Sequence, residues 1–216
     1  MTDHIRHIAV EGPIGVGKTS LARALADRLG GRLVLEPAEY NPFLEKFYAD
    51  MPRYALATQL SFLVARYQQQ AELRQQDLFE PVTVCDYLFV KDKIFAALTL
   101  SDDELNLYNQ LYAVLAGRAA RPDLVVLLDA GVETLLARIE RRGIPSESAV
   151  TADYLARLTA AYRRHFRLYA EAPLLVIDTE GLDYDRGGLD LDELLGEMEL
   201  TRAGRRLYTP GSQERD

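Results

Sequence analysis

Short apolar runs alternate with longer amphipathic stretches along this chain of 216 residues. Continuous apolar runs, which are typical of strands covered on both faces of a parallel sheet, stand out at residues 124–128 and 174–177. Three further segments also have strand character, and each of them ends in a polar residue or is followed by one. The pattern therefore predicts five strands, at residues 8–10, 31–35, 81–86, 124–129 and 174–178.

Long helical stretches lie between the predicted strands, which is the element order of an α/β fold. We expect a doubly wound, five-stranded parallel sheet flanked by helices, with its ligand beyond the carboxyl ends of the strands. Glu36, Asp86 and Asp129 end or follow predicted strands and are therefore candidates for the site. Residues 1–200 are predicted to form one domain, and residues 201–216 a polar tail whose end is disordered.

One predicted helix, at residues 51–76, is part of a longer insertion than the fold needs. Roughly forty residues of helical character separate the second and third predicted strands, whereas a parallel crossover connection needs only about a dozen residues. Gln59 and Arg66 lie two turns apart on one helix face, with Phe62 between them on the flank away from the apolar stripe. Two interpretations stay open: a solvated face of a core helix, or a wall that faces a planar ligand.

The strongest motif follows the first predicted strand and reads Gly12-Pro13-Ile14-Gly15-Val16-Gly17-Lys18-Thr19. It fits the phosphate-loop pattern G-x-x-x-x-G-K-[ST] and precedes a helical run, which is the context that the pattern requires. Glycines let backbone N–H groups wrap a polyphosphate, Lys18 reaches its β- and γ-phosphates, and Thr19 can hold Mg²⁺. We therefore expect residues 12–19 to bind the phosphates of a nucleotide.

Composition and charge narrow the function classes. The net charge of −8 and the isoelectric point near 5.0 argue against binding to a nucleic-acid polymer, which needs a surplus of clustered Lys and Arg. The single cysteine, Cys85, excludes an internal disulfide. No signal peptide or apolar run of membrane-spanning length is recognisable, so we expect a cytoplasmic protein with no membrane partner.

A basic cluster and one acidic residue each have two interpretations. Arg138, Arg141 and Arg142 precede a loop at residues 143–145 that contains Gly and Pro. They suit a lid that closes over phosphate oxygens, but cations also stabilise a solvated helix end. Asp129 is either a Mg²⁺ ligand or the N-cap of the next helix, and the cap is favoured because Asp86 also offers a carboxylate.

Together these features resemble the deoxynucleoside kinase family, and they look closest to its bacterial deoxyguanosine and deoxyadenosine kinases. The resemblance runs from residue 8 to about residue 147 and implies a P-loop kinase fold with an arginine-containing lid loop. The residues that carry it are Glu11 before the loop, Glu36-Pro37, Asn41-Pro42-Phe43-Leu44, Phe47-Tyr48, Gln59 with Arg66, Asp86-Tyr87, Ile94-Phe95-Ala96, Arg138-Ile139, Arg142-Gly143 and Glu147.

The resemblance implies transfer of the γ-phosphoryl group of ATP, with Mg²⁺, to the 5′-hydroxyl of a purine deoxynucleoside. Deoxyguanosine is favoured and deoxyadenosine comes next, as in deoxynucleotide salvage. By resemblance Glu36 is the general base, and Asp86 serves Mg²⁺ through water beside Thr19. Three cations, Lys18, Arg138 and Arg142, would surround the transferred phosphate.

The resemblance also implies how the acceptor binds. Gln59 would make two hydrogen bonds to the base edge with Arg66 behind it, and Tyr48 and Glu147 would bind the 3′-hydroxyl. Family members are often dimers, and residues 102–118 could supply such a face, so a homodimer is expected.

Two positions depart from the family pattern. Many members carry an arginine after the acidic residue that ends the third strand, whereas this chain has Tyr87, and Lys91 or Lys93 is left as a substitute. Ile144 removes one phosphate contact from the closing loop, and whether Arg141 compensates stays open.

Two other functions remain as alternatives. A nucleoside monophosphate kinase would need extra arginines for the acceptor phosphate, and a catalytically silent nucleotide-binding regulator would bind nucleotide without turnover.

Overall fold

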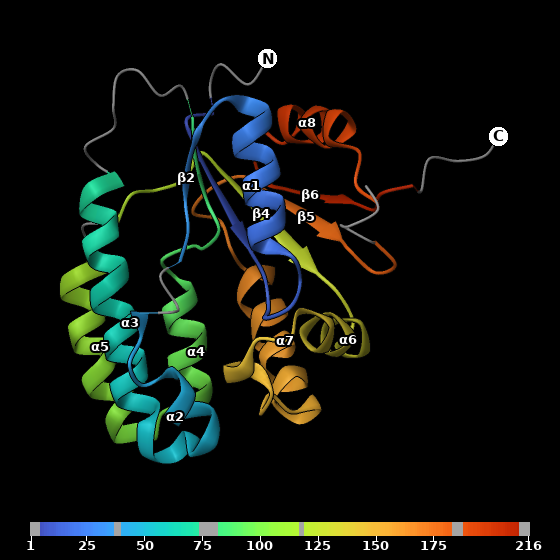
Figure 1. The fold of residues 1–216 in the computed structure, drawn as a ribbon. Coiled ribbons are helices and arrows are strands. Elements are labelled where there is room, and N and C mark those ends of the chain that lie inside the picture. The colour runs from blue at the N-terminus through green and yellow to red at the C-terminus, as the bar shows by residue number, and fades with distance from the viewer. Residues whose placement is uncertain (1–4, 37–39, 74–81, 117–118, 183–187, 212–216) are drawn as a thin grey trace.

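The computed structural model describes residues 5–36, 40–73, 82–116, 119–182 and 188–211 (Figure 1). One parallel sheet of six strands runs through its centre in the order β2-β3-β1-β4-β5-β6. The strands are β1 (His7–Glu11), β2 (Arg32–Val34), β3 (Thr83–Cys85), β4 (Leu124–Asp129), β5 (Leu174–Asp178) and β6 (Arg205–Tyr208).

The prediction of five strands was one too low. The five predicted segments contain or overlap β1 to β5, although residue 81 of the third lies outside the described residues. The sixth strand, β6, lies in the predicted tail and pairs in parallel with β5. Only Tyr208 of its four side chains is buried, because β6 is an edge strand, and apolar periodicity is weak in such a strand. The expected disordered end of the tail, residues 212–216, lies outside the described residues, and the division at residue 200 stays a prediction.

Helices flank the sheet and form two groups at its carboxyl edge (Figure 1). Helix α1 (Lys18–Leu29) packs against β1, β2 and β3. The group on the left of the figure is an assembly of α2 (Leu44–Ala49), α3 (Met51–Leu73), α4 (Lys91–Thr99) and α5 (Asp102–Ala116). The second group consists of α6 (Val132–Arg142) and α7 (Ala152–Arg167), with the short 3-10 helix η2 (Pro145–Glu147) between them along the chain. Helix α8 (Leu191–Leu200) belongs to neither group and lies near α1 (Figure 1).

Two apolar clusters hold these layers together. The larger one joins the buried strands β1 and β4 to α1, α6 and α7. The smaller one fills the space between α3, α4 and α5 around Leu63, Phe89 and Tyr108. Because Leu63 of α3 is buried in this second cluster, it holds α3 in place beside the carboxyl ends of β2 and β3 (Figure 1). Residues 74–76 of the predicted helix lie outside the described residues.

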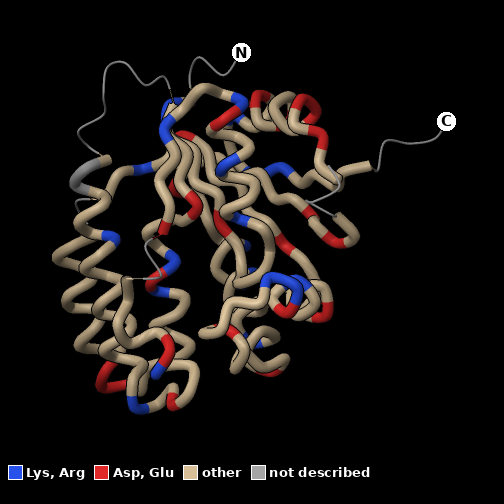
Figure 2. The backbone as a smooth tube through the Cα atoms, in the orientation of Figure 1, with Lys and Arg blue, Asp and Glu red and all other residues tan. Residues whose placement is uncertain are grey.

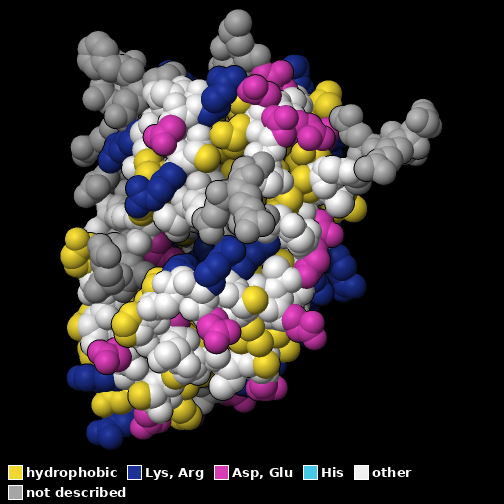
Figure 3. All heavy atoms as spheres, turned by 45° about the vertical axis from the view of Figure 1, so that its right-hand side comes forward, with side chains coloured by type: hydrophobic (Ala, Val, Ile, Leu, Met, Phe, Trp, Pro, Cys, Tyr) yellow, Lys and Arg dark blue, Asp and Glu magenta, His cyan; other side chains and the backbone are white. Residues whose placement is uncertain are grey.

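Charge is unevenly spread over the fold. Acidic and basic side chains are interspersed along the backbone, and basic ones stand out in the last turn of α6 (Figure 2). On the surface, Lys and Arg gather near the middle of one face, while acidic side chains are prominent near its edge (Figure 3). Within the described parts of the chain, no helix is both long and apolar enough to cross a membrane.

Candidate active site

The phosphate loop turns tightly between β1 and α1, and its geometry requires glycine. Gly12, Gly15 and Gly17 have φ values of +148°, +82° and +104°, a region that side chains rarely adopt. A Cβ atom at Gly15 would also lie 2.7 Å from Cγ1 of Ile139, and one at Gly12 would lie 2.5 Å from the Leu128 carbonyl oxygen. The loop leads directly into the N-terminus of α1, where the helix dipole favours an anion.

Lys18 closes the loop onto itself. Its ammonium donates to the carbonyl oxygens of Gly12, at 2.8 Å, and Pro13, at 2.9 Å. Burial and the nearby charge of Lys91 lower the pKa of Lys18 to about 8, against the opposing effect of Glu11. The lysine is thus held over the space that the loop encloses, where a phosphate would draw it away from the carbonyls.

Asp86 follows β3 and ties the phosphate loop to the segment after β2. The Thr19 hydroxyl donates to one carboxylate oxygen of Asp86 and the Glu36 amide donates to the other, each at 2.6 Å. The Thr19 hydroxyl and the Asp86 carboxylate are hard oxygen donors of the kind that Mg²⁺ prefers. The described residues contain no group of three or more His, Cys, Asp or Glu side chains that could hold a metal. The pair therefore fits a Mg²⁺ ion that is also coordinated by nucleotide phosphates.

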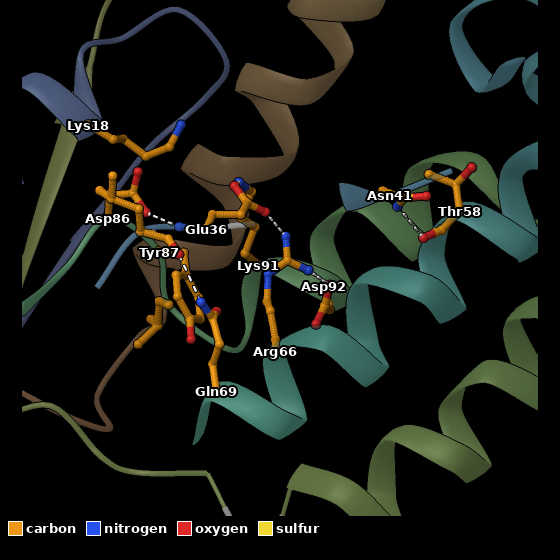
Figure 4. Close-up of polar contacts among 12 residues, drawn as sticks. Lys18, Glu36, Asn41, Thr58, Arg66, Gln69, Asp86, Tyr87, Lys91 and Asp92 are labelled. Carbon is orange, nitrogen blue, oxygen red and sulfur yellow. Dashed lines mark hydrogen bonds and ion pairs between the residues drawn. The ribbon is translucent and has the colours of Figure 1, made fainter. Parts of the chain in front are cut away.

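Glu36 is the centre of a buried ion-pair cluster (Figure 4). One of its carboxylate oxygens accepts from Arg66 and the other from Lys91, and the second guanidinium nitrogen of Arg66 donates to Asp92. Burial would raise the pKa of Glu36, but the charges of Arg66, Lys91 and Lys18 outweigh it and hold the pKa well below its ordinary value. Glu36 is therefore a carboxylate that faces cations from α3, α4 and the phosphate loop.

The two lysines left as substitutes for the missing arginine lie in different places. Lys91 is buried and bonds to Glu36, whereas Lys93 is exposed and lies over the Tyr112 ring at 4.8 Å. Tyr87, which stands where the arginine is usual, is buried, and its hydroxyl accepts from Gln70 at 3.4 Å. Of the two lysines, Lys91 alone bonds to Glu36.

Two polar side chains of α3, Gln59 and Arg66, are buried. Gln59 is 2% exposed and donates to the Thr99 hydroxyl at 3.4 Å. The Arg66 guanidinium lies 4.8 Å from the Phe62 ring centre, a cation–π distance. In the described part of the chain, Nε of Arg66 and Oδ2 of Asp92 are buried without a hydrogen-bond partner. Gln59 and Arg66 therefore do not lie on a solvated face, and contact of this face with a ligand stays a prediction.

Tyr48 and Glu147 come together from α2 and η2, which pack against each other. The pKa of Tyr48 is raised well above its ordinary value, first by burial and then by the charges of Tyr154 and Glu147. Arg142, at the end of α6, donates to Glu147. The structure therefore brings Arg142 to the side of Tyr48 and Glu147.

Arg138 connects α6 to the phosphate loop. Its guanidinium donates to the carbonyl oxygens of Val16 at 3.4 Å, Thr179 at 2.6 Å and Leu182 at 2.9 Å. Arg138 is thus built into the structure around the loop, whereas Arg141 is exposed at the helix end. The solvated interpretation of the basic cluster does not fit Arg138.

Comparison with known proteins agrees with this geometry. Residues 8–198 match the model of the deoxynucleoside kinase family. The chain belongs to this family. It is 34% identical over 193 residues to a deoxyguanosine kinase of Bacillus subtilis (strain 168). This alignment covers 87% of this chain and 93% of the relative. It is 32% identical over 192 residues to a deoxyadenosine/deoxycytidine kinase of the same organism, over 82% of this chain and 83% of the relative.

The fold is similar to that of a deoxyadenosine kinase from M. mycoides solved with dCMP and a flexible dCDP, with a TM-score of 0.78 and 23% sequence identity. The match covers 90% of this chain and 99% of the other. The predicted family and the α/β P-loop kinase fold are confirmed, as is the assignment as a nucleotide-binding transferase of the kinase class.

The favoured interpretation of Asp129 was wrong. The N-cap of α6 is Gly131 and no side chain of the cap residue bonds there, whereas Asp129 accepts from Nε of Arg163 at 2.9 Å. The carboxylate that stabilises the start of α6 comes from the loop after β5: Glu180 accepts from the Gly131 amide at 2.6 Å and from the Thr134 hydroxyl. Sequence spacing could not reveal this contact because Glu180 is 49 residues away from Gly131.

Two acidic residues had no role assigned from the sequence. Glu11, fully buried at the end of β1, accepts from the amides of Gly12 and Leu88, each at 2.8 Å, and from the Tyr162 hydroxyl at 3.1 Å. Burial raises the pKa of Glu11, although the charges of Lys91 and Lys18 oppose the shift. Asp92 was missed because a charge in the first turn of a helix normally indicates a solvated end. A lysine and an aspartate in succession within an apolar run were the available signal.

Proposed function

We propose that this kinase transfers the γ-phosphoryl group of ATP to the 5′-hydroxyl of a purine deoxynucleoside, and so serves deoxynucleotide salvage. The observation that carries the proposal is the Glu36 carboxylate, which is buried among cations and linked through Asp86 to Thr19 of the phosphate loop. Phosphoryl transfer needs in-line positioning and electrostatic stabilisation rather than covalent chemistry from the protein. A carboxylate and a phosphate loop joined in this way provide both.

The donor side is assigned to residues 12–19, which would hold the ATP phosphates with backbone amides and the Lys18 ammonium. Thr19 and Asp86 would hold Mg²⁺, in part through water. When bound, the ion would neutralise negative charge on the phosphate oxygens. Arg138 lies against the loop already, and Arg142 would leave Glu147 to reach the phosphate.

Glu36 is assigned as the general base. One of its oxygens would accept the hydrogen of the 5′-hydroxyl, and the neighbouring cations keep the group ionised at neutral pH. Gln69 donates to the carbonyl oxygen of Leu35 at 2.9 Å, which fixes the backbone just before the base. Its fixed position also lets Glu36 orient the hydroxyl for in-line attack.

The base and sugar are assigned to the walls next to Glu36. Gln59 would bond to the base edge with its amide, and Arg66, held by Glu36 and Asp92, would set the polarity behind it. Tyr48 and Glu147 would bond to the 3′-hydroxyl. Deoxyguanosine is the favoured substrate and deoxyadenosine the next, which agrees with the names of several relatives.

The two alternatives fit less well. A monophosphate acceptor would bring its own negative charge close to Glu36 and Glu147, which would repel it. A silent regulator would not need both an intact loop lysine and a buried carboxylate opposite to it.

The assembly and location of the chain are also inferred. We infer a homodimer, because α5 exposes Leu107, Leu111 and Val114 at helical spacing, within the region predicted to supply a dimer face. The cytoplasmic location stays a prediction.

The direct test uses ATP labelled on its γ-phosphate, Mg²⁺ and deoxyguanosine, with the product separated against 5′- and 3′-monophosphate standards. Label in deoxyguanosine 5′-monophosphate supports the proposal. Label only in the 3′-monophosphate, or ATP binding with no labelled product from any deoxynucleoside, contradicts it.

A further inference from the structure

The sequence left open whether Lys91 or Lys93 takes the place of the missing arginine. Lys91 is the first residue of α4, it is 6% exposed, and its ammonium bonds to the Glu36 oxygen that Arg66 does not occupy (Figure 4). Lysine is rarely buried to this extent unless it is paired. Its location beside Glu36 calls for a role in the reaction or in the structure.

The two cations on Glu36 differ in how firmly they are held. Arg66 is anchored a second time by Asp92, and its guanidinium lies 4.8 Å from the Phe62 ring centre and 5.8 Å from the Tyr87 ring centre, so it cannot move without breaking several contacts. Lys91 ends in a compact ammonium on a flexible stem, with three donors and the Phe95 ring at 5.5 Å. Of the two Glu36 oxygens, the one bonded to Lys91 is therefore the one that an incoming hydroxyl can share.

Lys91 also faces the phosphate loop. Its charge is the largest effect after burial among those that lower the pKa of Lys18, and it acts on Glu11 at the start of the loop as well. The Lys91 ammonium therefore bonds to Glu36 and also acts electrostatically on the lysine of the phosphate loop.

We propose that Lys91 is a positioning residue, which orients the Glu36 oxygen that it bonds toward the acceptor hydroxyl and keeps a positive charge beside the path of the phosphoryl group. This inference rests on the proposed function. In the step, the 5′-oxygen forms a bond to the γ-phosphorus while the bond from that phosphorus to the β-γ bridging oxygen breaks. The hydroxyl proton passes to Glu36, and ADP leaves with the electron pair of the broken bond.

The test compares Lys91→Met with Lys93→Met, a matched change two residues along α4 at an exposed side chain. Removal of a preorganised charge from a site of phosphoryl transfer lowers turnover by about 10²-fold to 10³-fold. We expect Lys91→Met to lower kcat for deoxyguanosine by about 10²-fold with a change in its KM of less than about threefold, because the base and sugar contacts remain. Lys93→Met should match the wild type in both constants.

Lys91→Arg separates positioning from packing. It restores the charge but not the shape, so recovery of at least about tenfold in kcat over Lys91→Met is expected if charge and hydrogen bonding are what matter. If Lys91→Met does not fold, as judged by its melting curve, Lys91→Gln replaces it, since this variant keeps a hydrogen-bond donor without the charge.

The results distinguish this inference from the proposed function. If the wild type phosphorylates no deoxynucleoside, the proposed function fails. If the wild type is active and a folded Lys91→Met or Lys91→Gln variant keeps wild-type kcat, the role of Lys91 is refuted. A loss that appears only in KM, or a loss that Lys91→Arg does not relieve at all, refutes it as well.

Discussion

Replacement of Glu36 by glutamine removes the charge at the centre of the acceptor site and leaves the shape of the side chain almost unchanged. The amide oxygen of the new side chain could still accept one hydrogen bond, but its NH₂ group would face a cation. Arg66 would retain Asp92 as its partner, whereas Lys91 would lose its ion pair with the carboxylate. The side chains of Glu36, Arg66 and Lys91 are 13%, 3% and 8% exposed, so solvent screens this loss poorly.

Two magnitudes follow for Glu36→Gln. Loss of one partner from a buried ion pair lowers the free energy of unfolding by about 3–5 kcal/mol. We expect a value at the lower end of this range because the amide oxygen still accepts one hydrogen bond. Loss of a positioned general base lowers turnover by about 10²-fold to 10⁴-fold. Deoxynucleoside binding should persist, since the proposed contacts with the base and the 3′-hydroxyl are assigned to other residues.

The assay combines a melting curve, the dissociation constant for deoxyguanosine, and kcat measured well below the melting temperature. The control is Glu140→Gln, the same substitution at an exposed position of α6. It should leave kcat unchanged and change the free energy of unfolding by no more than about 0.5 kcal/mol, as is usual for a surface substitution. Near-normal kcat in folded Glu36→Gln would remove Glu36 from the role of base. Unchanged stability would contradict the energy assigned to the buried ion pairs.

Three further substitutions test other parts of the site. Gly15→Ala places a Cβ atom where φ is +82° and α6 is in close contact. It should lower the free energy of unfolding by about 1–3 kcal/mol and weaken ATP binding, which melting curves with and without nucleotide would measure. Gln59→Ala should narrow the spread of kcat/KM among the four deoxynucleosides, and an unchanged spread would place the base elsewhere. Asp129→Asn should change stability by less than about 1 kcal/mol and leave the Mg²⁺ concentration needed for half-maximal activity unchanged, because the Asp129–Arg163 pair is partly exposed. A raised Mg²⁺ requirement would make Asp129 a metal-site residue after all.

Features whose residues lie close together in the sequence were predictable. The glycines of residues 12–19 need positive φ values, and the strand before them and helix after them are both encoded nearby, so the phosphate loop lies where the pattern predicts it. Asp86 and Glu36 were identified because the carboxyl ends of parallel strands meet at one edge of a sheet. Their mutual contact through the Glu36 amide confirms that they are close together.

Contacts between distant segments were not predictable. Asp92 reaches Arg66 across 26 residues, and Glu180 reaches the start of α6 from another loop, so neither contact has a periodic signal. Strand β6 was missed because an edge strand exposes most of its side chains and reads as a polar tail. The choice between Lys91 and Lys93 depended on which face of α4 turns inward, and the packing of α3 and α5 against that helix decides it.

The most direct measurement of the central claim is kcat/KM, with ATP and Mg²⁺, for the four natural deoxynucleosides and for deoxyguanosine monophosphate. We expect turnover of deoxyguanosine, with deoxyadenosine as the second choice, and no turnover of the monophosphate, because the groups assigned to the acceptor, Glu36, Tyr48, Gln59 and Glu147, suit neutral hydroxyls and a base rather than a phosphate. Turnover of the monophosphate alone, or none with any acceptor despite ATP binding, would contradict the assignment of Glu36 and its neighbours to the acceptor site.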